Sequence, residues 1–129
     1  MSRKQAIYST GILRRPGNVR YALVDVVNLN RTTSRNVTVE VFDWSSGSPV
    51  ALQIQPTGSQ RCKVKVGPNQ TVYLYADISN VRFKYEVRVS RILDRRLIAN
   101  VFGVTNVPYA PQEGGTVLQR NLVKINRVC

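Results

Sequence analysis

The sequence has no histidine, one tryptophan and only two cysteines among its 129 residues, and these scarcities exclude several classes of chemistry. Without histidine, neither a Ser-His-Asp or Cys-His nucleophilic site nor a Cys/His zinc site can form. Two cysteines, Cys62 and Cys129, cannot make a disulfide framework. Free thiols, an intramolecular bridge and a covalent crosslink between subunits remain as alternatives for them.

Acidic residues are also scarce, with 7 against 19 basic residues and a net charge of +12. The acids are dispersed, and most lie beside arginine or lysine, which predicts cross-strand ion pairs rather than a catalytic carboxylate pair. Gly114-Gly115 lacks the lysine and the spacing of a phosphate-binding loop. We therefore expect a protein that is not an enzyme and that needs no metal and no cofactor.

Long apolar runs are missing as well. No segment approaches the roughly 20 apolar residues of a membrane-spanning helix, so no membrane insertion is expected. The first residues do not read as a secretory signal, because Tyr8 to Gly11 interrupt the apolar run and Arg14-Arg15 follow. Synthesis in the cytoplasm is the resulting expectation.

Alternation of apolar and polar residues, which is typical of half-buried β-strands, extends over most of the chain. In 61–66, for example, one apolar face opposes a cationic face formed by Arg61, Lys63 and Lys65. Together with the turn signals, this pattern predicts strands at 20–29, 36–44, 50–55, 61–66, 71–77, 82–92, 97–104 and 116–125. Such spacing indicates an all-β fold, an antiparallel β-sandwich of eight to nine strands that is jelly-roll-like or immunoglobulin-like. Asp94 to Arg96 are expected at a hairpin tip.

An additional β-prone segment, Gln5 to Leu13, precedes this domain as an N-terminal extension strand. A charged turn separates the two, which divides the chain into an arm or connector at 1–18 and a sandwich domain at 19–129. The arm either pairs within its own chain as the first strand or adds to a sheet edge of a neighbouring copy. The docking residues would be Gln5, Ala6, Ile7, Tyr8, Ile12 and Leu13, and the hinge would be Arg14, Arg15, Pro16 and Gly17.

The basic composition suggests a different function, the binding of nucleic acid. A sheet that presents Arg61, Lys63 and Lys65 beside Tyr73 and Tyr75 would resemble a nucleic-acid-binding surface, as in a phage or viral coat protein. Tyrosine stacking would also suit a polysaccharide-binding module, which is a third alternative. Trp44, at the end of a predicted strand, is expected to cap the core.

Three phrases carry a resemblance to a known family: Tyr21–Leu29, Asn36–Trp44 followed by Ser45–Pro49, and Tyr85–Val89. They look like segments of small all-β proteins of spore-forming Firmicutes, and the layout of a short arm before an eight-stranded domain is similar to the endospore appendage (Ena-type) fibre subunits. The resemblance implies jelly-roll filaments in which an N-terminal connector docks into the preceding subunit. Connectors of that family typically carry cysteines, whereas Ser2–Pro16 has none, so a noncovalent joint is expected.

These observations lead to one functional hypothesis. The protein is expected to be a structural subunit that forms a head-to-tail homopolymer, a pilus-like fibre or appendage, through its N-terminal donor strand. The expected location is the endospore or cell surface, where the partner would be an anionic surface or an anchor protein. Binding to nucleic acid is the alternative.

Overall fold

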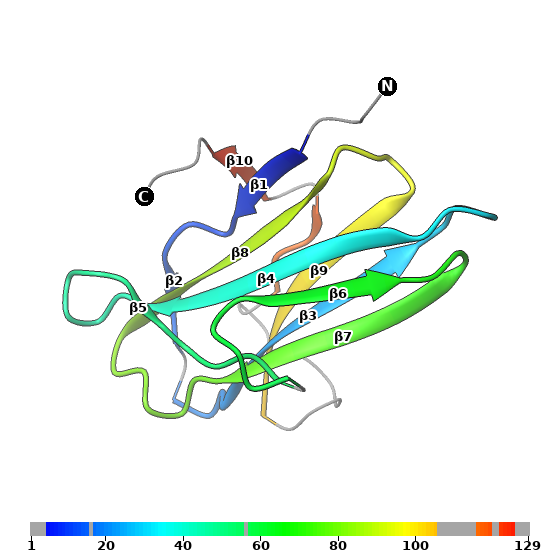
Figure 1. The fold of residues 1–129 in the computed structure, drawn as a ribbon. Coiled ribbons are helices and arrows are strands. Elements are labelled where there is room, and N and C mark those ends of the chain that lie inside the picture. The colour runs from blue at the N-terminus through cyan, green and yellow to red at the C-terminus, as the bar shows by residue number, and fades with distance from the viewer. Residues whose placement is uncertain (1–4, 16, 56, 106–115, 120–121, 126–129) are drawn as a thin grey trace.

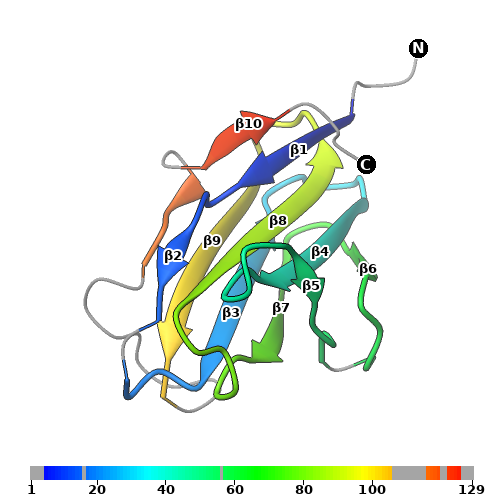
Figure 2. The ribbon, with the colours of Figure 1, turned by 90° about the vertical axis from the view of Figure 1, so that its left-hand side faces the viewer.

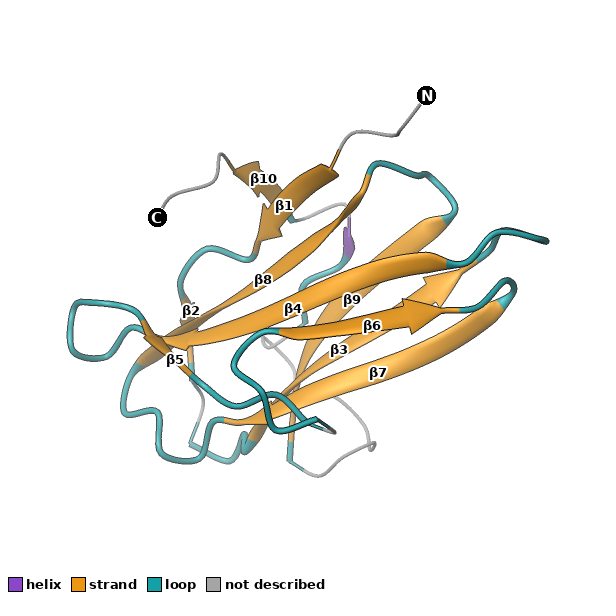
Figure 3. Cartoon of the chain, viewed as in Figure 1, coloured by secondary structure: helices purple, strands orange, loops and turns teal. Residues whose placement is uncertain are grey.

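The computed structural model describes residues 5–15, 17–55, 57–105, 116–119 and 122–125. Ten strands follow one another along the chain (Figure 1). Their bounds are β1 Gln5–Ser9, β2 Leu13–Arg14, β3 Tyr21–Asn28, β4 Arg35–Asp43, β5 Val50–Ala51, β6 Cys62–Val66, β7 Gln70–Asp77, β8 Lys84–Ile92, β9 Leu97–Val104 and β10 Val123–Ile125. Strands dominate the described ranges (Figure 3) and no α-helix occurs in them, so the predicted all-β class is confirmed.

Two antiparallel sheets form the molecule, and they lie face to face (Figure 2). The larger sheet, sheet A, has the order β10-β1-β8-β4-β5. Two more strands belong to it: β2 follows β1 along the same edge of β8, and β6 lies beside β5 along the same edge of β4. The smaller one, sheet B, has the order β7-β3-β9. All interstrand ladders described are antiparallel, as the sequence predicted.

Period-two alternation places one side of each long strand in the space between the sheets. In β4, Val37, Val39 and Val41 are fully buried while the residues between them are exposed or half-buried. Sheet B contributes its own buried rows to the same cluster, including Val24 and Leu74. The core therefore lies between the two sheets, and the alternate side chains of each sheet form an outer face.

Several predicted boundaries differ from the structure. The strand predicted at 50–55 is a two-residue β5 followed by isolated bridges at Ile54 and Gln55. Among the described residues of 116–125, Val123–Ile125 forms a strand and Val117 makes one bridge to Val101. Both segments lie on sheet margins, where local propensity is not matched by a full-length partner.

The hairpin predicted at Asp94 to Arg96 is wrong. This turn connects β8 to β9, but β8 belongs to sheet A and β9 pairs with β3 in sheet B. The chain therefore crosses from one sheet to the other here. A turn signal between two alternating segments does not distinguish a hairpin from a connection between sheets, because both need the same tight reversal.

Tyr85, on the inner side of β8, is expected to tolerate loss of its hydroxyl. Its side chain is 0% exposed, and the hydroxyl has no hydrogen-bond partner among the described residues. Since an unpaired buried hydroxyl costs free energy, Tyr85→Phe should leave the free energy of unfolding unchanged or raise it by up to about 1 kcal/mol. Thermal denaturation at neutral pH measures this, and a loss of more than about 1 kcal/mol would contradict it.

Alkaline pH should widen the difference in free energy of unfolding between Tyr85→Phe and the wild type. Burial raises the pKa of Tyr85 to about 12, so the unfolded chain loses this proton first, near pH 10, and folding becomes less favourable as the pH rises from about 10 to about 12. The Phe variant lacks this dependence, and its stability should fall less steeply over that interval.

Candidate assembly site

The N-terminal segment lies along one whole edge of β8 in its own chain. Gln5 to Ser9 pair with Ile92 to Arg88, and Leu13 and Arg14 pair with Tyr85 and Lys84. The amide of Arg15 then donates to the carbonyl of Phe83 at 3.0 Å. On its other side β1 pairs with β10, so β1 is a strand inserted between two others (Figure 2).

A one-residue bulge separates β1 from β2. Ser9 lies opposite Arg88 and Leu13 opposite Tyr85, so four steps along the segment match three steps along β8. Thr10 maintains the ladder across the bulge: its amide donates to Val87 O at 3.1 Å, and its hydroxyl oxygen accepts from the amide of Val87 at 3.0 Å. Gly11 has a φ of +67°, a left-handed conformation that glycine adopts without strain.

The docking residues predicted from sequence have different surroundings. Ala6 is buried, and Tyr8 and Leu13 pack against the core between the sheets. Ile7 is half-buried on the outer face opposite Ser90, Gln5 is exposed, and Ile12, in the bulge, is 50% exposed. The apolar contact between the segment and the sandwich therefore comes from every second residue, with a change of phase at the bulge.

The predicted hinge is shorter in the structure. Arg14 belongs to β2, and Arg15 is half-buried with its Nε donating to Val19 O at 2.8 Å and Nη1 to Val81 O at 3.4 Å. Pro16 lies outside the described residues. Gly17 is exposed in a turn, with open space where a side chain would be. Arg14 and Arg15 are therefore held by the sandwich and do not act as a free hinge.

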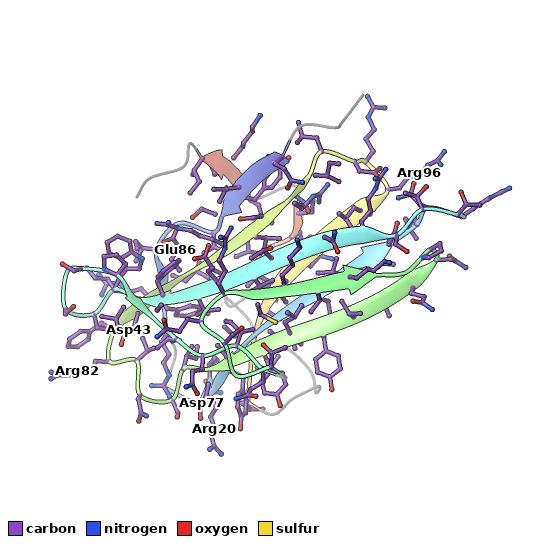
Figure 4. The ribbon with its side chains drawn as sticks, viewed as in Figure 1. Arg20, Asp43, Asp77, Arg82, Glu86 and Arg96 are labelled. Atoms are coloured by element: carbon purple, nitrogen blue, oxygen red, sulfur yellow. The ribbon has the colours of Figure 1, made fainter. Side chains whose placement is uncertain are left out.

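Glu86 fixes the segment to the outer face of sheet A (Figure 4). Although it points away from the core, its side chain is only 7% exposed. Its carboxylate accepts hydrogen bonds from Ser9 Oγ, from Trp44 Nε1 at 3.0 Å and from Arg88 Nε at 3.0 Å. The Arg88 guanidinium also lies 4.8 Å from the centroid of the Phe42 ring. One buried carboxylate thus joins β1, β8 and the end of β4.

Sequence reasoning missed this cluster and predicted that Trp44 caps the core. Trp44 is instead half-buried beside β8 on the outer side of sheet A, bound to Glu86. One local signal was available: Glu86 is an isolated acid between Lys84 and Arg88 on the same strand face. The partner Ser9 lies 77 positions away and could be assigned only from the pairing of β1 with β8.

A second buried polar cluster closes one end of the sandwich. Asp94 accepts hydrogen bonds from Asn30 Nδ2 at 2.9 Å, Arg35 Nε at 2.8 Å and the Arg96 amide at 2.9 Å. Arg91, 4% exposed, donates to Asp94 O at 2.7 Å and to Gln119 Oε1 at 2.6 Å. These contacts are structural, since every charge faces an opposite charge or a hydrogen-bond acceptor.

The cationic and aromatic residues highlighted by the sequence belong to different sheets. Arg61, Lys63 and Lys65 are exposed on the outer face of sheet A. Tyr73 and Tyr75 stack on the outer face of sheet B, with ring centroids 6.2 Å apart. The rings of β7 and the cations of β6 therefore do not share the single open sheet face that the nucleic-acid alternative assumed.

Cys62, the cysteine that the described part of the chain contains, is not placed for crosslinking. Cys62 is a free thiol, 1% exposed, and accepts a hydrogen bond from Thr57 Oγ1 at 3.2 Å. Cys129 lies outside the described residues. A disulfide from Cys62 to another subunit would require opening of the fold, because the thiol is buried between the sheets.

Three further findings concern metal sites, membrane-spanning helices and related proteins. Within the described residues, no group of three or more His, Cys, Asp or Glu side chains could hold a metal ion. The same ranges contain no helix with the length and apolarity needed to cross a membrane. Comparison with models of protein families, with curated proteins and with solved structures gave no match.

Proposed function

We propose that the protein is a non-enzymatic structural subunit that assembles head to tail by donating residues 5–14 to the next copy. The observation that carries the proposal is the position of β1 between β8 and β10. Withdrawal of this strand would leave a slot with unpaired ladder groups on both sides, which only another β-strand can satisfy. In the single chain the slot is filled by the chain's own arm, and in the assembly a neighbour supplies the same strand.

The remaining strands support a separable donor and acceptor. Without β1 and β2, sheet A retains β8, β4, β5 and β6 as paired strands, and sheet B retains all three of its strands. Most of the buried cluster comes from these strands, so the sandwich keeps its core. The donor contributes ladder hydrogen bonds of about 0.5–1.5 kcal/mol each and the burial of Ala6, Tyr8 and Leu13.

Exchange of the strand leads to a polymer because the donated segment and the receiving slot are different surfaces. Such a heterologous contact generates an open chain unless the rotation between subunits closes a ring. The joint is noncovalent, since Ser2–Pro16 contains no cysteine. We place the polymer, with a jelly-roll-like subunit, at an endospore or cell surface, on the basis of the resemblance to appendage subunits.

The test is deletion of Ser2–Pro16, followed by addition of a synthetic peptide of residues 5–15. Full-length protein is expected to form fibres in negative-stain electron microscopy. The truncated protein should be a folded monomer that binds the peptide without forming fibres, because the peptide fills the slot but carries no further domain. An unfolded truncated protein, or a full-length protein that stays monomeric at all concentrations, would contradict strand exchange.

A matched variant separates pairing within the chain from pairing between chains. Deleting Gly17 and Asn18 shortens the connection between Arg15, fixed to β8, and the buried Val19. The arm then reaches its own slot only under strain, whereas it reaches a neighbour's slot freely, so fibre formation should increase. If the shortened chain remains a monomer of full stability, the arm belongs to its own sandwich alone.

A further inference from the structure

A groove runs across the strands on the outer face of sheet A. Its floor follows one row of directly opposed residues, in which Lys63 on β6 faces Thr38 on β4, and Thr38 faces Ser90 on β8. Ser90 in turn faces Ile7 on β1, and Ile7 faces Ile125 on β10. The groove has a volume of about 680 Å³ and includes Lys63, Thr38, Ser90, Ile7 and Ile125 in its lining.

The lining is hollowed at its centre because Thr38 and Ser90 are short, while long side chains stand at its two ends. Arg61 and Lys63 form the end at β6, and Lys124 stands at the end at β10. All three cations are exposed. No acidic residue lines the groove, so an anion within it meets positive charge from both ends.

The floor offers neutral hydrogen-bonding groups between these charges. Asn36, Thr38 and Gln5 line it together with Ser90. The side-chain amide and hydroxyl groups of Asn36, Thr38 and Gln5 can bind the neutral polar groups of a ligand that the flanking cations attract.

We propose that this groove binds a segment of an acidic polysaccharide, with the cations holding its carboxylates and the floor holding its hydroxyls. The cations at the two ends and the hydroxyl and amide groups between them suit a polymer that carries both carboxylates and ring hydroxyls. Single-stranded nucleic acid fits less well, because it is held by stacking on aromatic rings and no ring lines this groove. The volume suits a short stretch of an extended chain.

This inference goes beyond self-assembly, because it concerns a ligand and not a second copy. The two are nevertheless connected through Ile7 and Gln5, which line the groove from β1. A donated strand would complete the groove of the receiving subunit as its own strand does, so binding and polymerisation are separable by substitutions on β6.

The test uses sodium polygalacturonate as the probe, titrated into the full-length protein by calorimetry at about 50 mM salt. The double variant Arg61→Ala/Lys63→Ala should lose about tenfold in affinity, because each exposed cation contributes a modest attraction. Lys65→Ala is the matched control: Lys65 is exposed on the same strand and does not line the groove. This control should change the affinity by less than about twofold.

Thr38→Val provides a readout that a change of charge would not give, because it removes a hydroxyl from the groove floor and keeps the size of the side chain. It should lower the affinity by about threefold with little change of the melting temperature. Uncharged dextran should not bind, and a DNA duplex should bind more weakly than polygalacturonate. No binding of polygalacturonate, equal losses in Lys65→Ala and the double variant, or tighter binding of DNA would each overturn the proposal.

Discussion

Replacement of Asp94 by alanine is expected to lower the free energy of unfolding by about 3–5 kcal/mol, the cost of removing one partner from a buried ion pair. The Asp94 side chain is 6% exposed and that of Arg35 is 15% exposed. The substitution leaves Arg35 and the Asn30 amide without their acceptor, although Arg91 keeps its bond to the Asp94 carbonyl. Chemical denaturation measures the loss.

The control for this variant is Asp77→Ala. Asp77 is exposed and accepts hydrogen bonds from the amide and hydroxyl of Ser79. Its removal should cost less than about 1 kcal/mol, because solvent replaces those partners. Figure 4 shows that Asp77 lies far from Arg96, at the other end of the sandwich. Equal losses in the two variants would contradict a special role for the buried cluster.

The contribution of Asp94 should also depend on pH. Burial alone raises the pKa of Asp94, but hydrogen bonds from the Arg96 amide, Asn30 and Arg35 lower it well below its usual range. A carboxyl whose pKa is lower in the folded state stabilises the fold above its unfolded pKa, near 3.9. That stabilisation is lost as the pH falls below about 3.9, so the difference between wild type and Asp94→Ala should narrow in acid.

Glu86→Ala is expected to lower the free energy of unfolding by about 2–4 kcal/mol and to loosen β1 in particular. Removal of the carboxylate leaves the Trp44 N–H and the Arg88 guanidinium without their acceptor, and it breaks the hydrogen bond from Ser9 that joins β1 to the outer face. Hydrogen exchange measured by NMR should show faster exchange at the amides of β1 than at those of β3.

Two variants serve as controls for Glu86. Ser9→Ala removes the contact to Glu86 from the β1 side, together with the bond that the Ser9 oxygen accepts from the Gly11 amide. It should reproduce the faster exchange of β1 with a smaller loss of stability, about 1 kcal/mol. Glu40→Ala removes a half-buried acid from the neighbouring strand on the same face and should cost less than about 1 kcal/mol. Unchanged protection of β1 in Glu86→Ala would show that the carboxylate does not fix this strand.

The segment at residues 5–14 shows how far the sequence could predict the candidate site. Its strand character and its separation from the rest of the chain were evident, and Gly11 within an apolar segment is a known signal of a bulge. The edge that receives it was not predictable. Pairing of β1 with β8 joins residues more than 75 positions apart, and no local pattern encodes such a register.

The outer faces of the two sheets show the same limit of prediction from the sequence. The alternation in 61–66 and 71–77 identified which side chains point outward, and the structure confirms this for Lys63, Lys65 and Tyr73. Whether the rings and cations share a surface depends on the assignment of β6 to sheet A and β7 to sheet B. The turn between them looks like any other turn in the sequence.

By itself the sequence determined the all-β class, the inward and outward sides of most strands, the excess of positive charge and the exclusion of histidine chemistry. These properties depend on composition and on a period of two, which are local. Only the tertiary structure decided which strands are neighbours, and with that the slot between β8 and β10, the buried Glu86 and Asp94 clusters and the groove across sheet A. Each of these brings together residues that are distant in sequence, and their positions are set by the packing of the two sheets as a whole.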